Sequence, residues 1–164
     1  MFIIGIIANS AQAKQIEKEI KQENIKIIWI NNKSIENVKN ITFEIIIMQN
    51  LEEKLKENNE SLKKILKNSR NILLNTDISI DSKIFEITKA QIITYGLKQK
   101  STITTSSIEE NQTIVSIQRA FKNVKGQVVE RQEIPTELNK KGINNIYITL
   151  IKTAIINIQG VKNG

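Results

Sequence analysis

The chain has no cysteine and no histidine, and these two absences exclude several kinds of chemistry. Disulfide bonds, a cysteine nucleophile and a histidine general base are excluded, as are the zinc sites built from these residues. Aromatic residues make up only 4% of the sequence, and there is one proline, Pro135. The missing cysteine is compatible with a reducing compartment, and we expect a cytoplasmic location.

Long apolar runs are also missing. Residues 1–7 are apolar, but polar Asn9 and Ser10 follow almost at once, and no basic residue precedes the run. This stretch is too short for a signal peptide or a membrane span. We therefore expect no membrane span and interpret residues 2–8 as a central strand.

The chain carries a net charge of +7, with 24 basic and 17 acidic residues. Most lysines are interspersed with glutamates, as in residues 14–23 and 52–67, and this mixture is typical of solvated helix faces. A solvated face is therefore favoured over a nucleic-acid patch. A basic groove that holds an anionic ligand is the other alternative.

Apolar runs bounded by polar turns predict five buried strands in the first part of the chain. They lie at residues 2–8, 25–30, 43–48, 72–74 and 92–95. Apolar residues at helical spacing predict helices over about 10–24 and 51–67, and a short helix over 81–88 with Asp81 or Ser82 as its cap. Continuous apolar strands separated by helices indicate an α/β fold, with a Rossmann-like, mainly parallel sheet flanked by helices.

The pattern changes after Gly96. Residues 101–108, 113–121 and 127–134 are strand-like and predict a three-stranded antiparallel meander, which Pro135 closes. A wide apolar face predicts a last helix over about 143–158. We predict a single domain over 1–164, with a parallel part at 1–97, the meander at 98–138 and a closing helix at 142–160.

Polar residues follow the predicted strands where an α/β sheet binds its ligands. Asn75 and Asp77 follow the strand at 72–74, and they could bind a nucleobase or ribose, or simply form a turn. The turn after the first strand has no glycine and matches neither common phosphate-binding motif. An anion could still bind there at the helix N-terminus, beside Asn9 and Ser10.

Several short segments occur in an order that resembles a known family. They are Ile4-Gly5-Ile6, Met48-Gln49-Asn50-Leu51, Leu74-Asn75-Thr76-Asp77, Ile93-Thr94-Tyr95-Gly96-Leu97 and Gly142-Ile143-Asn144-Asn145-Ile146-Tyr147. In this order they resemble the central domain of the Mur ligases, ATP-dependent enzymes that add amino acids to a cell-wall precursor. The resemblance implies that Asn50, Asn75, Asp77 and Asn145 are remnants of the edge of a nucleotide site.

The family's phosphate-binding loop would fall at residues 8–14, where its glycines and its Lys-Thr/Ser pair are gone. We therefore expect a non-catalytic, Mur-ligase-like binding or regulatory domain with a cell-wall role and no cofactor or metal. Its partner would be a second copy of the chain or a larger protein. The alternatives are a weak ATP or ADP binder or ligase remnant, and a module that binds polyanions or nucleic acid.

Overall fold

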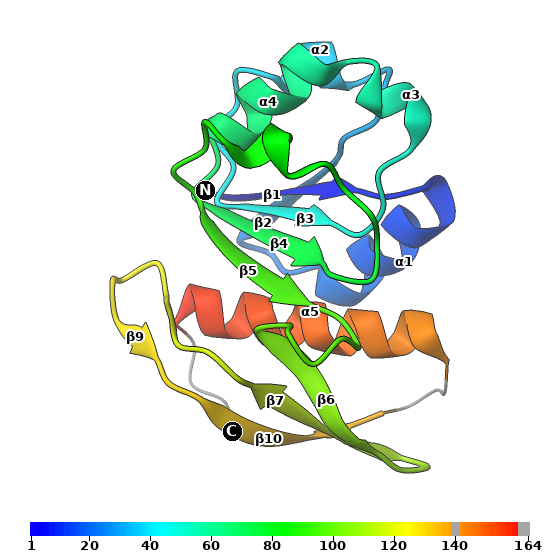
Figure 1. Cartoon of the computed structure of the whole chain (residues 1–164), viewed down its shortest axis with the longest axis vertical. Helices are drawn as coiled ribbons and strands as arrows, with labels where there is room; N and C mark the ends of the chain where they lie inside the picture. Colours follow the sequence, from blue (N-terminus) through cyan, green and yellow to red (C-terminus); the bar gives the residue numbers. More distant parts are fainter. Residues whose placement is uncertain (139–141, 161–164) are drawn as a thin grey trace. The chain divides into compact units, whose positions relative to one another are not determined.

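The computed structural model describes residues 1–138 and 142–160. Eight strands in this part of the chain belong to one mainly parallel sheet flanked by helices, and two more form a small antiparallel sheet (Figure 1). The predicted α/β fold class is therefore confirmed. The chain divides into two compact units, residues 1–92 and 93–164, and each is described by itself.

Parallel strands form the centre of the first unit. They are β1 (Phe2–Ile7), β2 (Ile25–Trp29), β3 (Ile45–Met48) and β4 (Asn71–Asn75), in the order β2-β1-β3-β4. The strand β5 (Gln91–Tyr95) begins beside β4, where the Gln91 N–H donates to the Arg70 carbonyl at 3.0 Å. This order is that of flavodoxin-type doubly wound sheets, and its topological switch point lies between β1 and β3.

Helices cover both faces of this parallel sheet (Figure 1). The helix α1 (Ser10–Ile20) lies on one face and buries Ala13, Ile16 and Ile20. The other face carries α2 (Ile35–Val38), α3 (Glu53–Lys56), α4 (Asn59–Lys67) and the 3-10 helix η1 (Ser82–Phe85). The core on that second face includes Ile7, Ile30, Ile35, Phe43, Ile46, Met48, Leu62, Ile65, Leu66 and Ile72.

The single helix predicted over 51–67 is wrong, because two shorter helices occupy this stretch. The chain leaves helical geometry at Asn58, whose φ and ψ are −91° and 44°. Asparagine is a poor helix former, so Asn58 and Asn59 favour a break here. The predicted short helix after β4 is confirmed as η1, with the Asp81 side chain accepting the Lys83 N–H at 3.0 Å.

Antiparallel strands dominate the second unit. They are β6 (Ile103–Ile108), β7 (Gln112–Ile117) and β10 (Gln132–Glu137), and the end of β5 pairs with β6 in parallel. The predicted three antiparallel strands are confirmed, but the third lies at Gln132–Glu137 and not at 127–134. The strands β8 (Phe121–Lys122) and β9 (Val128–Val129) form a separate hairpin between β7 and β10. Pro135 lies inside β10, opposite Ile114, and does not close the meander. An edge strand tolerates proline, because the missing N–H is not needed for pairing.

The closing helix is confirmed as α5 (Ile143–Gln159), which packs on β6. Its Tyr147 ring meets the buried Tyr95 ring edge to face, with the centroids 6.2 Å apart. The helix ends at Gly160, whose φ of 77° suits a residue without a side chain. Across residues 1–138 and 142–160, no helix combines the length and the apolarity that crossing a membrane requires.

Candidate functional site

The turn between β1 and α1 is capped by the protein's own side chains. Asn9 precedes α1, and its side-chain oxygen accepts the Gln12 N–H at 2.9 Å. The Gln12 side chain accepts the Asn9 N–H at 3.2 Å in return, which completes a capping box. Asn9 thus binds a first-turn N–H group that an anion would need, while Ser10 is exposed at the first helical position.

The carbonyl groups at the end of β1 are also engaged. The Ile7 carbonyl accepts the N–H groups of Gln49 and Asn50, at 2.9 and 3.2 Å. The buried Ala8 carbonyl accepts the indole N–H of Trp29 at 3.0 Å. Protein groups from the β2 side and from the β3 side therefore both bond to the end of β1.

Little space remains at this switch point. A hollow of about 10 Å³ lies there. It is lined by Ile7, Ala8, Ile30, Asn31, Asn32, Asn50, Glu52 and Leu55. A volume of this size holds roughly one water molecule. A nucleotide is much larger than this hollow.

Asn75 ends β4 and is only 2% exposed. Its side-chain NH₂ donates to the Gln49 carbonyl at 3.3 Å, and its side-chain oxygen accepts the Asp77 N–H at 2.9 Å. The structure thus gives Asn75 a turn-forming and strand-linking role, which is the simpler of its two expected roles. Asp77 lies in the same turn and is half-buried.

Three of the candidates, Asn9, Asn50 and Asn75, follow parallel strands and come to the same edge of the first unit. Asn145 belongs to the second unit, where it lies half-buried on α5 and its carbonyl accepts the Thr149 hydroxyl at 2.9 Å. The predicted nucleotide and anion contacts of these residues stay predictions.

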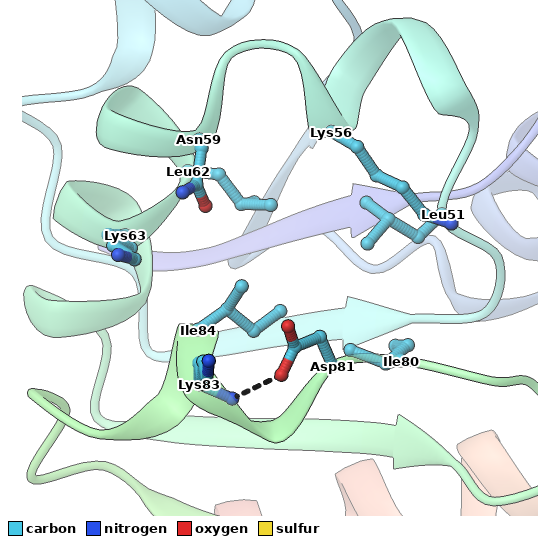
Figure 2. A pocket seen from close by; sticks show the side chains of 9 residues that line it. All are labelled: Leu51, Lys56, Asn59, Leu62, Lys63, Ile80, Asp81, Lys83 and Ile84. Carbon is cyan, nitrogen blue, oxygen red and sulfur yellow. Dashed lines mark hydrogen bonds between the residues drawn. The ribbon is translucent and has the colours of Figure 1, made fainter.

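A larger hollow of about 320 Å³ lies between α3, α4 and η1 (Figure 2). We call it the α4–η1 hollow. Its lining consists of Leu51, Lys56, Asn59, Leu62, Lys63, Ile80, Asp81, Lys83 and Ile84. Lys63 and Lys83 lie at one end in Figure 2, Lys56 lies toward the other, and aliphatic side chains lie between them. The hollow therefore combines an apolar interior with a basic rim.

The charges in the α4–η1 hollow differ in their surroundings. Lys56 pairs with Glu53 at 2.9 Å, on an exposed part of α3. Asp81 accepts the backbone N–H of Lys83, so one carboxylate oxygen is committed to capping η1. The lining has three lysines and one aspartate, so its net charge is positive. Because Lys56 is paired with Glu53, most of this positive charge lies at the end with Lys63 and Lys83.

A second basic hollow, of about 380 Å³, lies between α2 and α4, and we call it the α2–α4 hollow. It is lined by Lys39, Glu60, Ser61, Lys63, Lys64, Lys67 and Ile87. Lys63 lines both hollows. The α2–α4 hollow has one aliphatic side chain and four lysines, so it is the more polar of the two.

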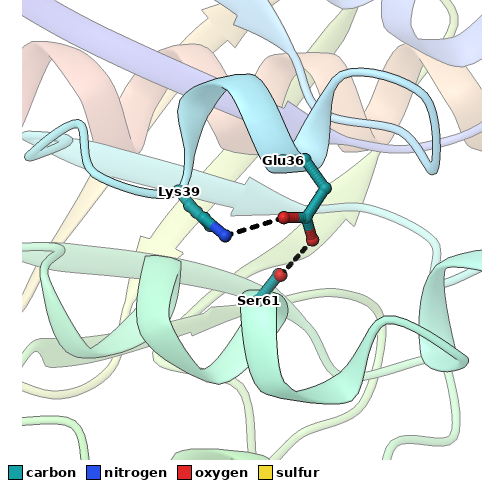
Figure 3. A network of polar contacts seen from close by, with 3 residues as sticks. All are labelled: Glu36, Lys39 and Ser61. Carbon is teal, nitrogen blue, oxygen red and sulfur yellow. Dashed lines mark hydrogen bonds and ion pairs between the residues drawn. The ribbon is translucent and has the colours of Figure 1, made fainter.

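A polar contact ties α2 to α4 beside the α2–α4 hollow (Figure 3). Glu36 of α2 accepts hydrogen bonds from the Lys39 ammonium, at 2.7 Å, and from the Ser61 hydroxyl of α4. These two bonds, the Lys39 bond first, hold the pKa of the Glu36 carboxyl below its usual value. They also draw Lys39 toward Glu36, so the lysines on α4 are the more available cations.

The lysines of 52–67 favoured a solvated helix face over the alternative of a basic groove, so neither hollow was located from the sequence. The Asn58-Asn59 pair was the available signal, since a break there turns one helix into two that can flank a depression. The described residues contain no cluster of three or more acidic side chains that could hold a metal ion.

The first unit is a doubly wound α/β structure, because its parallel strands have the order β2-β1-β3-β4 and helices cover both faces of the sheet. No protein-family model and no curated protein matches the chain.

Proposed function

We propose that this chain is a non-catalytic binding or regulatory domain. The observation that carries this proposal is the filled turn after β1. Doubly wound nucleotide enzymes hold phosphate on free backbone N–H groups at this turn. Here the Asn9 side chain takes one such group, and a hollow of about 10 Å³ lies at the neighbouring switch point.

A relation to the Mur ligase central domain is part of the proposal. It is supported by the order of the short matching segments along the chain. The edge-to-face contact of Tyr95 and Tyr147 joins two of those segments within the second unit. On this basis we propose a role in cell-wall synthesis, beside a second copy of the chain or a larger partner. A gene position among cell-wall genes would support this role, and an unrelated setting would weaken it.

The experiment that tests the proposal measures ATP hydrolysis by the purified chain with Mg²⁺. We expect no turnover above the rate in buffer, because phosphoryl transfer needs positioned phosphate and metal contacts. Hydrolysis at enzyme-like rates, about 1 s⁻¹ or faster, would contradict the proposal. As a control for contaminating enzymes, the elution profile of any residual ATP hydrolysis is compared with that of the chain, and the two should not coincide.

Calorimetry with ATP, ADP and AMP separates this proposal from the alternative of a weak adenine-nucleotide binder. The matched variant is Asp77→Ala, which removes the carboxylate but keeps the backbone N–H that Asn75 binds. Binding heat that is lost in this variant would support the alternative. No heat with the unchanged chain at millimolar nucleotide would remove it.

A polyanion-binding module is the second candidate function, and the α2–α4 hollow favours it because four lysines line one depression. Binding of a labelled single-stranded RNA should then weaken steeply as salt rises, because counterions are released. At a fixed salt concentration, the double variant Lys64→Gln, Lys67→Gln should bind the RNA more weakly than the unchanged chain. The control variant Lys14→Gln, Lys18→Gln on α1 should have less effect. Binding that does not depend on salt, or no binding at low salt, would remove this candidate.

A further inference from the structure

We propose that the α4–η1 hollow binds a small carboxylate that carries an apolar body. This inference rests on the proposed binding role and names the class of ligand. The volume of the α4–η1 hollow, about 320 Å³, falls at the lower end of the range for small-molecule sites. Such sites combine an apolar interior with a few convergent polar groups, and the lining of this hollow has that composition.

The apolar interior comes from three segments that are separate in the sequence. Leu51 follows β3, Leu62 lies on α4, and Ile80 and Ile84 come from the segment after β4. Leu51 and Ile80 therefore lie beyond the carboxyl ends of neighbouring parallel strands, where doubly wound folds bind ligands. An aliphatic or aromatic group placed over these side chains would be removed from water, at roughly 25 cal/mol per Å².

The charged head of the ligand belongs at the end of the hollow with Lys63 and Lys83 (Figure 2). Lys56, toward the other end, already pairs with Glu53 at 2.9 Å. The Asp81 carboxylate lies beside Lys83 and offsets part of the charge. With three lysines against Asp81, and Glu53 paired to Lys56, the lining suits one negative charge better than a polyphosphate.

The amide of Asn59 adds a polar group from the first turn of α4. Its side chain offers both a donor and an acceptor, so it can bond a carboxylate oxygen or a neighbouring hydroxyl of the ligand. An acid that is apolar apart from its head therefore meets complementary groups along the length of the hollow.

The test is a titration of the whole ¹⁵N-labelled chain with hexanoate, followed by NMR. Hexanoate should shift the backbone signals of residues 59–63 and 80–84 in a saturable way. Acetate has no apolar body and hexanamide has no charge, so each should bind at least about tenfold more weakly. Equal shifts with acetate or with hexanamide would overturn the proposal, as would the absence of saturable shifts with hexanoate.

A pair of charge-matched variants tests the position of the head. Lys63→Gln with Lys83→Gln should weaken hexanoate binding at least about tenfold, because each charged hydrogen bond contributes strongly. Lys14→Gln with Lys18→Gln, on the opposite face of the first unit, should leave it within about twofold. Equal weakening in both variants would show a general charge effect and would overturn the site.

These outcomes are independent of the ATP assay. A chain that hydrolyses ATP removes the non-catalytic proposal whatever hexanoate does. A chain that neither hydrolyses ATP nor binds hexanoate keeps the non-catalytic proposal and loses this site.

Discussion

Gly5 gives the sharpest prediction about packing in the first unit. It lies in β1 between Ile28 of β2 and Ile46 of β3. A Cβ atom at this position would lie 2.7 Å from Ile30 Cδ1 and 2.8 Å from Ile46 Cδ1. It would also lie 3.0 Å from the Phe43 ring. We therefore expect Gly5→Ala to destabilise the protein, even though alanine is otherwise favoured over glycine.

The magnitude follows from two opposing effects. Inserting a methyl group into a filled core costs about 1–3 kcal/mol. Where alanine can adopt the backbone conformation of the glycine it replaces, the substitution raises the free energy of unfolding by about 0.4–1 kcal/mol. Ile30, Phe43 and Ile46 are 0% exposed, so none of them can move out toward water. The midpoints of the two ranges leave a net loss of about 1.3 kcal/mol, which corresponds to roughly 3–5 °C in Tm for a chain of this size.

Urea unfolding followed by fluorescence measures this loss, because Trp29 is the only tryptophan and lies in the strand beside β1. The control is Ile46→Val, which removes the Cδ1 atom that the new methyl group would meet. Alone it should cost about 0.5–1.5 kcal/mol. In the double variant the two effects should be less than additive, by at least about 0.5 kcal/mol. A neutral Gly5→Ala variant, or strict additivity, would refute the packing argument.

Three further predictions concern polar contacts. Trp29→Phe should lower the free energy of unfolding by about 1–3 kcal/mol, because the buried Ala8 carbonyl loses its donor; denaturant midpoints measure this. Asn75→Ala should cost a similar amount through its two lost bonds; thermal unfolding measures this, and an unchanged Tm would contradict their contribution to stability. The lowered pKa of Glu36 means that its contribution to stability is present above the unfolded pKa, about 4.3, and is lost as pH falls through the lower folded value. Lys39→Gln should raise the Glu36 pKa in an NMR titration, and an unchanged pKa would contradict the assigned cause.

The parallel strands and the last helix were predictable because each is a local pattern. The runs of isoleucine at residues 2–7 and 45–47 are apolar on both faces, as a strand covered by helices on both sides must be. The wide apolar face of α5 likewise predicted a helix over nearly its observed length, Ile143–Gln159. Local pattern failed at the helix break at Asn58 and at the hairpin of residues 121–129. Apolar spacing continues across Asn58, and the hairpin depends on which segments pair with each other.

The candidate site was predictable only in part. Sequence placed Asn9, Asn50 and Asn75 after strands, and they do share one edge of the first unit. Sequence left open whether Asn75 forms a turn or binds a ligand, because the same amide can do either. Only the fold shows that its side chain is bonded to the Gln49 carbonyl and the Asp77 N–H.

The sequence by itself determined the fold class and the absence of cysteine and histidine chemistry, because composition and apolar periodicity are properties of the chain. Tertiary structure decided where space remains. It joined the ends of β1 and β3 by contacts among residues distant in sequence, such as those of the Ile7 carbonyl with the Gln49 and Asn50 N–H groups. It also formed a basic hollow that Lys63 of α4 and Lys83 of η1 line together with aliphatic side chains. Cavities arise from packing between segments, and no local pattern records them.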